Sequence, residues 1–395
     1  MTILSLSSDH ASGESPLQVY ILAGQSNMQG HAQVRTLEHL GMDPNTVPML
    51  EEIQNSDGES VVCDRVWISS IGSSAAEKVG KLTTGFGAEG GGPKIGPELT
   101  FGIYTQKLTN APVLIIKTAW GGKSINTDFR PPSAGPYEFN DQQVARLKEQ
   151  GKDLEQAKAA KAEATGKYYR LMIDHVRFVL SDLQRVCPDY DPELGYELAG
   201  FVWFQGWNDM VDRSTYPDRD KPDGYAEYSI VMTDFIKDVR RDLRAPKLPF
   251  VIGVLGVGGP VANYSDGERR YAGIHTNFRS AMAAPASNPQ FRGNVSAVLT
   301  ENYWDPQLKE LQARWEKVKS QNRSLQQNTE LSQQEKKQRL EQFTNELFSE
   351  QELQIRETGI SNAAYHYLGS AKILGRIGKA FAESLHELRS NSKED

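Results

Sequence analysis

Short apolar runs of strand length recur along this chain and alternate with longer segments of helical periodicity. Each run is rich in β-branched or aromatic residues, and the runs cover residues 19–23, 113–118, 200–204, 250–255 and 295–299. The helical segments fall at about residues 98–109, 167–186, 225–243, 269–284 and 371–389. Strands that alternate with helices in this way form a parallel sheet covered on both faces. The pattern predicts an α/β fold, a three-layer sandwich around a doubly wound parallel sheet.

Two stretches look like additions to this core. Residues 141–165 are rich in Ala, Lys, Glu and Gln, which predicts a solvated helix. Residues 306–353 carry a thin apolar series with a break near residues 328–332, which predicts a helical hairpin with one apolar seam. We therefore expect one domain over residues 1–395 with helical insertions at about 141–165 and 306–353. A packed structural role is the expectation for the second insertion, and a lid or a partner-binding arm is the alternative.

The charge and the cysteines exclude some classes of protein. The net charge of −7, without a basic stripe, argues against nucleic acid as a partner. Only two cysteines are present, too few for a disulfide framework, and no metal-ligand spacing occurs. Residues 1–16 lack a basic start followed by a long apolar run, so we expect neither a secretory signal nor a membrane span. The compartment is undetermined.

The first apolar run ends in Ala23-Gly24-Gln25-Ser26-Asn27-Met28. A serine just past the carboxyl end of a strand lies where parallel α/β sheets bind ligands. A helix that begins there also directs backbone N–H groups at an oxyanion. Because serine is a favoured helix cap, a structural role for Ser26 is the alternative. Met28 replaces the second glycine of the Gly-x-Ser-x-Gly elbow, which argues against an ordinary α/β-hydrolase.

The second run ends in Trp120-Gly121-Gly122-Lys123-Ser124. Gly-Lys-Ser also ends the phosphate loop of nucleotide-binding enzymes, but that loop needs a glycine where this chain has Lys117. Paired glycines after a strand instead let the backbone approach a substrate closely, with an exposed N–H directed at it. A tight turn is the structural alternative for Gly121 and Gly122.

The third run continues into Phe204-Gln205-Gly206-Trp207-Asn208-Asp209. A side-chain amide at such a position can donate to a developing oxyanion, where loss of one donor typically costs roughly 3–4 kcal/mol. Gln205 and Asn208 are therefore candidate donors. A polar turn, in which Asn and Asp bond to nearby backbone, is the alternative.

A histidine is needed as general base. His366 lies in a loop just before the last helical segment, where the chain can return to the sheet edge that holds Ser26. The other histidines lie in the polar N-terminus, on the loop after Ser26 or within helical patterns: His10, His31, His39, His175, His275 and His386. We expect His366 to be the base.

Together these segments resemble the SGNH hydrolases, whose sheet is flavodoxin-like. The closest resemblance is to the sialate O-acetylesterase-like group that includes carbohydrate esterase family six and its acetylxylan esterases. The resemblance lies in these segments: residues 19–30, Gly96-Pro97-Glu98-Leu99, residues 120–124, residues 203–209 and the tail around His366. The Gln-Ser-Asn-Met phrase is specific, and the match covers most of the chain outside the two insertions.

The resemblance implies a serine esterase that removes O-acetyl groups from an acetylated carbohydrate through an acyl-enzyme, without metal or cofactor. Ser26 would attack the acetyl carbonyl, and His366 would take its proton and later activate water. Members of the group are often secreted or periplasmic.

The resemblance also implies an oxyanion hole built from the Ser26 N–H, the N–H of Gly121 or Gly122, and a side-chain amide. The esterases of this group tend to carry Gln-Gly-Glu-x-Asp, which favours Gln205. The wider superfamily carries Gly-x-Asn-Asp, which matches Asn208.

One departure from the group concerns the third member of the triad. The group has an aspartate three residues before the histidine, where this chain has Ala363, and the preceding Asn362 is not a carboxylate. Either a distant acid, Glu301 or Glu357, or a backbone carbonyl would then orient His366. Glu301 is the first candidate, because it lies just past residues 295–299, the expected last strand. A catalytically degraded carbohydrate-binding or scaffold protein on the same fold is the alternative function.

Overall fold

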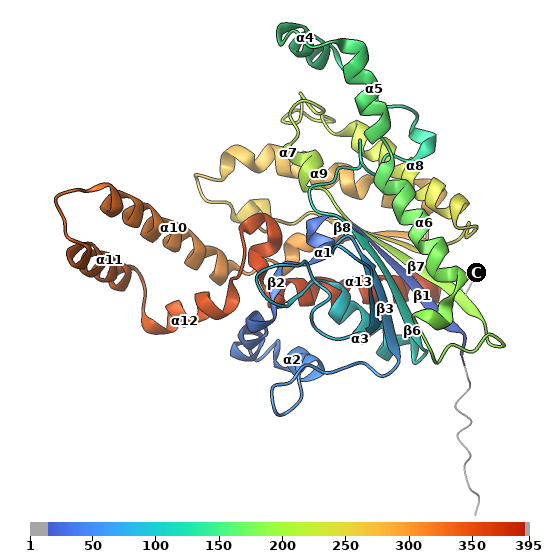
Figure 1. Cartoon of the computed structure of the whole chain (residues 1–395), viewed down its shortest axis with the longest axis horizontal. Coiled ribbons are helices and arrows are strands. Elements are labelled where there is room, and N and C mark those ends of the chain that lie inside the picture. Colours follow the sequence, from blue (N-terminus) through green and yellow to red (C-terminus); the bar gives the residue numbers. More distant parts are fainter. Residues whose placement is uncertain (1–14, 392–395) are drawn as a thin grey trace, which may run out of the picture.

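A mostly parallel sheet of seven strands forms the centre of the computed structural model, which describes residues 15–391 (Figure 1). Within this sheet only β3 and β4 pair antiparallel; its other neighbouring strands pair parallel. In spatial order the strands are β4 (Lys78–Lys81), β3 (Val66–Ile71), β6 (Val113–Ala119), β1 (Leu17–Gly24), β7 (Tyr196–Phe204), β8 (Phe250–Val254) and β9 (Val295–Leu299). The predicted α/β fold is confirmed.

All the apolar runs identified in the sequence are strands of this sheet, whereas β3 and β4 were not predicted. β3 contains Ser69 and Ser70, so it is not an apolar run, although both serines are buried. Ser69 is satisfied there because its hydroxyl donates to Glu77 Oε1 at 2.7 Å and lies 2.8 Å from His175 Nε2. β4 is an exposed edge strand with no apolar face.

Helices cover both faces of the sheet. On one face α3 (Glu98–Thr109) packs against α13 (Ala371–Asn391), and a Cβ on Gly378 would lie 2.1 Å from the Pro97 carbonyl oxygen, so glycine permits this close approach. The opposite face carries α6 (Lys167–Ser181), α8 (Ala226–Asp242) and α9 (Ala272–Ala283) (Figure 1). Smaller elements are α1 (Ser26–Gln29), β2 (Ala32–Gln33), α2 (Val47–Ile53), β5 (Lys94–Ile95) and α7 (Trp207–Val211).

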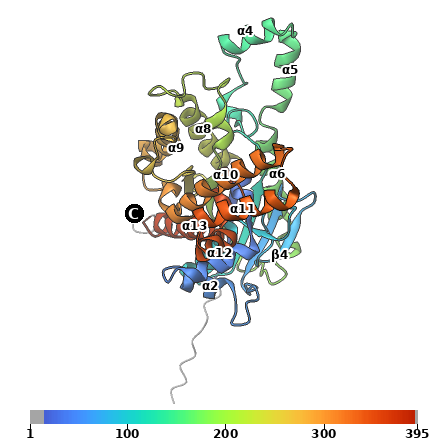
Figure 2. The ribbon, with the colours of Figure 1, turned by 90° about the vertical axis from the view of Figure 1, so that its left-hand side faces the viewer.

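Both expected insertions are helical and extend away from the sheet (Figure 1). The first is two helices, α4 (Asp141–Glu149) and α5 (Leu154–Ala164), rather than one, because Gly151 breaks the helix at φ 64°. The second consists of α10 (Pro306–Gln327), α11 (Gln333–Leu347) and α12 (Glu350–Gly359), which Figure 2 shows side by side. Its apolar residues form a separate small core around Leu311, Val318 and Phe348. The division into one domain with two insertions stays a prediction.

Among the helices between residues 15 and 391, none combines the length and the apolarity needed to cross a membrane. In the same span no group of three or more His, Cys, Asp or Glu side chains is arranged to hold a metal ion. His10 lies outside the described residues, as does most of the N-terminal segment considered above.

Candidate active site

Ser26 begins α1 directly after β1, at the carboxyl edge of the sheet. The chain turns at Gly24, where a Cβ would lie 2.1 Å from the carbonyl oxygen of Phe204 in β7, so only glycine fits. The Gln25 N–H donates to that same carbonyl at 3.3 Å. Because β1 lies between β6 and β7, the carboxyl ends of three strands meet around Ser26, the position at which parallel sheets bind ligands. Ser26 is 9% exposed.

Gly121 faces Ser26 from the end of β6. A Cβ on Gly121 would lie 4.0 Å from Ser26 Cβ and 3.0 Å from Gln29 Oε1. The preceding Trp120 N–H donates to the Gly24 carbonyl at 3.2 Å, which ties this loop to the end of β1. Gly122 has φ 75° and no neighbouring atom within 4 Å of its Cβ position. The structure therefore brings Gly121 against Ser26, with Gly122 further out in the open.

Gln205 is buried beneath this loop, and its amide nitrogen is already occupied. Gln205 Nε2 donates to the Lys123 carbonyl at 2.9 Å and to the Asp209 carboxylate, and it lies 3.4 Å from Gln25 Oε1. Its Oε1 accepts from the Tyr228 hydroxyl at 3.2 Å. Gln205 therefore links the loops that follow β1 and β6 to α7.

Asn208, the other amide candidate, lies in α7 and is half-buried. Within residues 15–391 no hydrogen bond engages its side chain. The neighbouring Trp207 ring lies 5.6 Å from the Tyr365 ring, so α7 adjoins the loop that carries His366. An unengaged amide at this place is free to donate to a ligand.

Asp209, which the sequence presented only as part of a polar turn, is a buried carboxylate that accepts a hydrogen bond from Gln205. It is fully buried, and its carboxylate accepts from the backbone N–H groups of Ile125 at 2.9 Å and Asn126 at 3.2 Å. Burial raises the pKa of Asp209 to about 6, while the donated hydrogen bonds oppose that rise. The residue anchors the chain that follows Gly121 and Gly122.

His366 lies in a 3₁₀ segment, η9 (Ala364–Gly369), that contacts α1. Within residues 15–391 no direct hydrogen bond joins His366 to Ser26, and such contacts are often looser before substrate binds. Its Nδ1 lies 3.1 Å from Asn362 Oδ1. In the tautomer with the proton on Nδ1, His366 donates to Asn362 and keeps Nε2 free as a base.

The loop after His366 is held in an unusual conformation. Tyr367 and Leu368 both have left-handed backbones, with φ 51° and 61°. The Tyr367 hydroxyl accepts from the Gly256 N–H at 2.8 Å and lies 2.6 Å from Thr300 Oγ1, so the tight turn is anchored in the core. The turn thereby brings the His366 ring back over Asn362.

His31 stacks on His366, which the sequence did not predict. The ring centroids are 3.9 Å apart and the planes differ by 4°. Burial, followed by the charges of His366 and Lys94, lowers the pKa of His31 to about 3. Burial and Lys94 lower the pKa of His366 to about 4. Both rings are therefore neutral near pH 7, and no local sequence signal links them, because they lie far apart in the chain.

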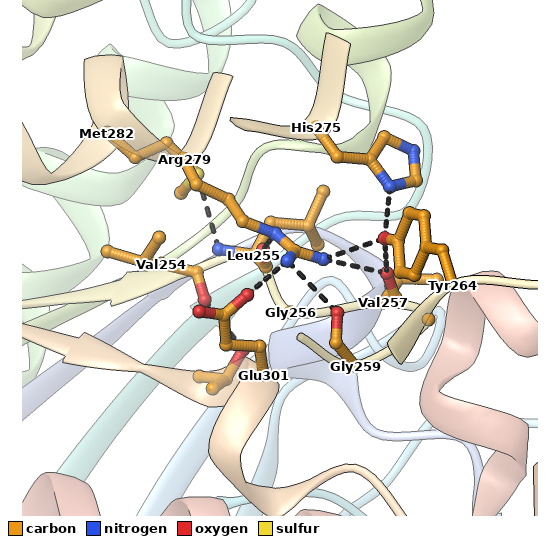
Figure 3. Close-up of polar contacts among 12 residues, drawn as sticks. Val254, Leu255, Gly256, Val257, Gly259, Tyr264, His275, Arg279, Met282 and Glu301 are labelled. Atoms are coloured by element: carbon orange, nitrogen blue, oxygen red, sulfur yellow. Dashed lines mark hydrogen bonds and ion pairs between the residues drawn. The ribbon is translucent and has the colours of Figure 1, made fainter. Parts of the chain in front are cut away.

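Glu301 does not take the position expected of an orienting acid. Its carboxylate forms an ion pair with Arg279 of α9, as Figure 3 shows. Arg279 also donates to the carbonyls of Val257 and Gly259, each at 3.0 Å. No hydrogen bond joins Glu301 or Glu357 to His366 in the part of the chain that the structure describes. Glu301 has this other partner because Arg279 packs beside the end of β9, which the sequence does not reveal.

Comparisons with known proteins identify a protein family whose sequence model matches this chain. The model of a carbohydrate esterase family described as sialic acid-specific acetylesterase matches residues 16–276. One similar solved structure is a protein from Arabidopsis thaliana, with TM-score 0.37, 16% identity, and coverage of 72% of this chain and 86% of that one. Another is a carbohydrate acetylesterase from Xanthomonas citri, with TM-score 0.40, 14% identity, and coverage of 73% and 51%. No curated protein matches the chain.

Proposed function

The chain belongs to the carbohydrate esterase family of sialic acid-specific acetylesterases, and on that basis we propose that it removes O-acetyl groups from a carbohydrate by serine catalysis. The observation that carries the proposal is the meeting of Ser26, Gly121 and the His366 loop at the carboxyl end of β1. This combination provides a nucleophile, an oxyanion donor and a base at one sheet edge.

In the proposed reaction Ser26 Oγ attacks the acetyl carbonyl carbon while His366 Nε2 accepts the serine proton. The backbone N–H groups of Ser26 and Gly121 hold the oxyanion of the tetrahedral intermediate. Its collapse releases the sugar hydroxyl, which receives the proton from His366. Water, deprotonated by the same imidazole, then attacks the acetyl-serine; as the second tetrahedral intermediate collapses, acetate leaves and Ser26 Oγ regains its proton from His366.

We assign the orientation of His366 to Asn362 rather than to a carboxylate. Asn362 Oδ1 also accepts from the Ala363 N–H at 2.8 Å, and only the oxygen of an amide can accept from that donor. The oxygen therefore faces His366 Nδ1, which must carry the proton. An amide acceptor selects the productive tautomer but supplies no full charge to stabilise the imidazolium.

We assign the side-chain oxyanion donor to Asn208. The N–H groups of Gln205 Nε2 are directed at Lys123 and Asp209, so Gln205 acts as a positioning residue for the loop that carries Gly121. The side chain of Asn208 forms no hydrogen bond with any of the described residues.

The test compares p-nitrophenyl acetate hydrolysis by the wild type, Ser26→Ala and His366→Ala, with circular dichroism to check folding. We expect both variants to lose about a thousandfold or more in kcat with an unchanged fold. The activity should persist in EDTA. A Ser26→Ala enzyme that keeps more than about a tenth of the rate would require another nucleophile. A wild type inactive on every acetyl ester tried would favour the non-catalytic carbohydrate-binding alternative.

A further inference from the structure

Two cavities flank the loop that carries His366. The insertion cavity, of about 780 Å³, lies between this loop and the helices α10 and α12 of the second insertion. The aromatic cavity, of about 510 Å³, lies on the other side, against α7 and α9. Ala364 lines both cavities, and it is two residues from His366. Each volume is within the range of roughly 300–1,000 Å³ that is typical of small-molecule sites.

Charged and amide side chains are prominent among the residues that line the insertion cavity, and one face of α10 supplies part of its wall. Gln312, Glu316 and Lys319 line it, and their spacing places them on one side of α10. Glu316 accepts from Gln312 at 2.7 Å and from Lys319 at 2.9 Å. Leu311, Trp315 and Val318 of α10 instead pack in the small core of the insertion. Amide, carboxylate and ammonium groups of this kind both donate to and accept from sugar hydroxyls.

The aromatic cavity offers ring faces, which the insertion cavity does not. Trp207, Tyr264 and Tyr271 line it, and Tyr271 is 40% exposed. The negative face of an aromatic ring attracts the C–H groups on the face of a pyranose ring. Arg213, which is exposed at its edge, adds a donor for hydroxyl or carboxylate oxygens. The two kinds of contact that a sugar chain needs are thus present on the two sides of the His366 loop.

We propose that a glycan chain crosses this loop, with sugar units in both cavities and the acetylated unit between them at Ser26 and His366. The proposal rests on the proposed esterase function and specifies its substrate class: an acetylated oligosaccharide or polysaccharide rather than a single sugar. It also gives the second insertion a role, because α10 forms a wall of the binding groove. Binding of units remote from the acetyl group then contributes to kcat/KM.

The test measures acetate release from chemically acetylated xylo-oligosaccharides of one to six units, with p-nitrophenyl acetate as a small substrate that reaches neither cavity. We expect kcat/KM per acetyl group to rise about tenfold or more with chain length. Lys319→Ala and Tyr271→Ala should each remove about fivefold or more of that gain and leave p-nitrophenyl acetate hydrolysis unchanged. Equal values at all lengths would overturn the proposal.

Matched control variants are available for both walls. Lys317→Ala changes the same residue type on α10, at an exposed position outside the cavity. Tyr196→Ala changes a tyrosine that is 43% exposed at the amino end of β7, away from the site. Neither control should alter the dependence on chain length. If the controls and the cavity variants lost the same amount, the cavities would have no special role and the proposal would fail.

A binding measurement separates this proposal from the esterase proposal. Calorimetric titration of the Ser26→Ala protein with unacetylated xylohexaose measures binding in the groove in the absence of catalysis. Binding that Lys319→Ala and Tyr271→Ala weaken, and that the controls do not, supports the groove even if p-nitrophenyl acetate is not hydrolysed. Absence of binding, together with rates that do not depend on chain length, overturns the groove and leaves the esterase proposal standing.

Discussion

The Oδ1 atom of Asn362 lies 3.1 Å from Nδ1 of His366 and accepts a hydrogen bond from the Ala363 N–H at 2.8 Å. The second contact determines the first, because the backbone donor orients the amide so that its oxygen faces the imidazole. An Asn that turned its NH₂ group to the ring would select the unproductive tautomer, which in a serine protease triad lowers kcat about 10⁴-fold.

Asn362→Leu should lower kcat by about a hundredfold or more, because it removes the acceptor that selects the tautomer. Asn362→Asp should raise kcat at neutral pH, since a carboxylate stabilises the imidazolium. Steady-state kinetics on p-nitrophenyl acetate measure both. Glu301→Gln is the control, with kcat expected to change by less than about threefold, because Glu301 pairs with Arg279. A large loss of kcat in Glu301→Gln, together with an unchanged kcat in Asn362→Leu, would show that Glu301 and not Asn362 orients His366.

The pH profile should show an acid limb of kcat/KM near pH 4, because the proposed base must be neutral and burial lowers the pKa of His366 to about 4. The activity should therefore persist at pH 5 and fall as the pH drops through 4. In Asn362→Asp the added charge raises the pKa of His366, so the limb should move to higher pH. A wild-type limb near 6.5, the ordinary value for histidine, would contradict the expected burial of the base.

Asn208→Ala should lower kcat by about 10²–10³-fold with little change in the urea midpoint, because it removes an oxyanion donor that supports no other contact. Gln205→Ala should lower both kcat and stability, since Gln205 links Lys123, Asp209 and Gln25. Kinetics and urea unfolding of the two variants separate these effects. The assignment of the donor would move to Gln205 if Asn208→Ala were fully active.

His31→Ala should lower kcat by about tenfold, because His366 loses the ring that restrains its rotation and excludes water from one face. His31→Phe, which retains a stacking ring, should restore most of the rate. A merely structural role would lower the urea midpoint of both variants without moving kcat of the folded enzyme. Equal kcat values for the alanine and phenylalanine variants would exclude the stacking role.

The free energy of unfolding should be lower at pH 5 than at pH 7. Burial lowers the pKa of these histidines in the folded protein: His31, His39, His175, His275 and His366. Between pH 6.5 and about 4 the unfolded chain therefore binds more protons than the folded one. For each excess proton, the free energy of unfolding decreases by about 1.4 kcal/mol for every unit by which the pH is lowered. Asp209, with its pKa raised to about 6, opposes this trend by a single proton.

Urea titrations at the two pH values measure this difference. His275→Gln should reduce the difference, because it removes one of the histidines whose pKa burial lowers. Equal urea midpoints at pH 5 and pH 7 would contradict the assignment of these histidines as neutral in the folded protein.

The sequence alone was sufficient for five of the seven strands of the sheet and for the helices that cover it, whereas the roles of Ser26 and His366 stay predictions. A buried strand such as β1 and an amphipathic helix such as α13 are encoded by the spacing of neighbouring apolar residues. The residue that follows a parallel strand is also local information, and it predicts where a ligand binds. β3 escaped prediction because the partners that satisfy its buried serines, Glu77 and His175, lie elsewhere in the sequence.

Only the tertiary structure decided which side chains surround His366. The left-handed turn at Tyr367 and Leu368 folds its ring over Asn362, and the packing of β2 and η9 places His31 on its other side. Glu301 pairs with Arg279 instead of His366, and no pattern near residue 301 could reveal that partner. Such contacts depend on distances between segments far apart in the chain. Packing of the whole molecule sets these distances, whereas local propensity sets only the elements that are packed.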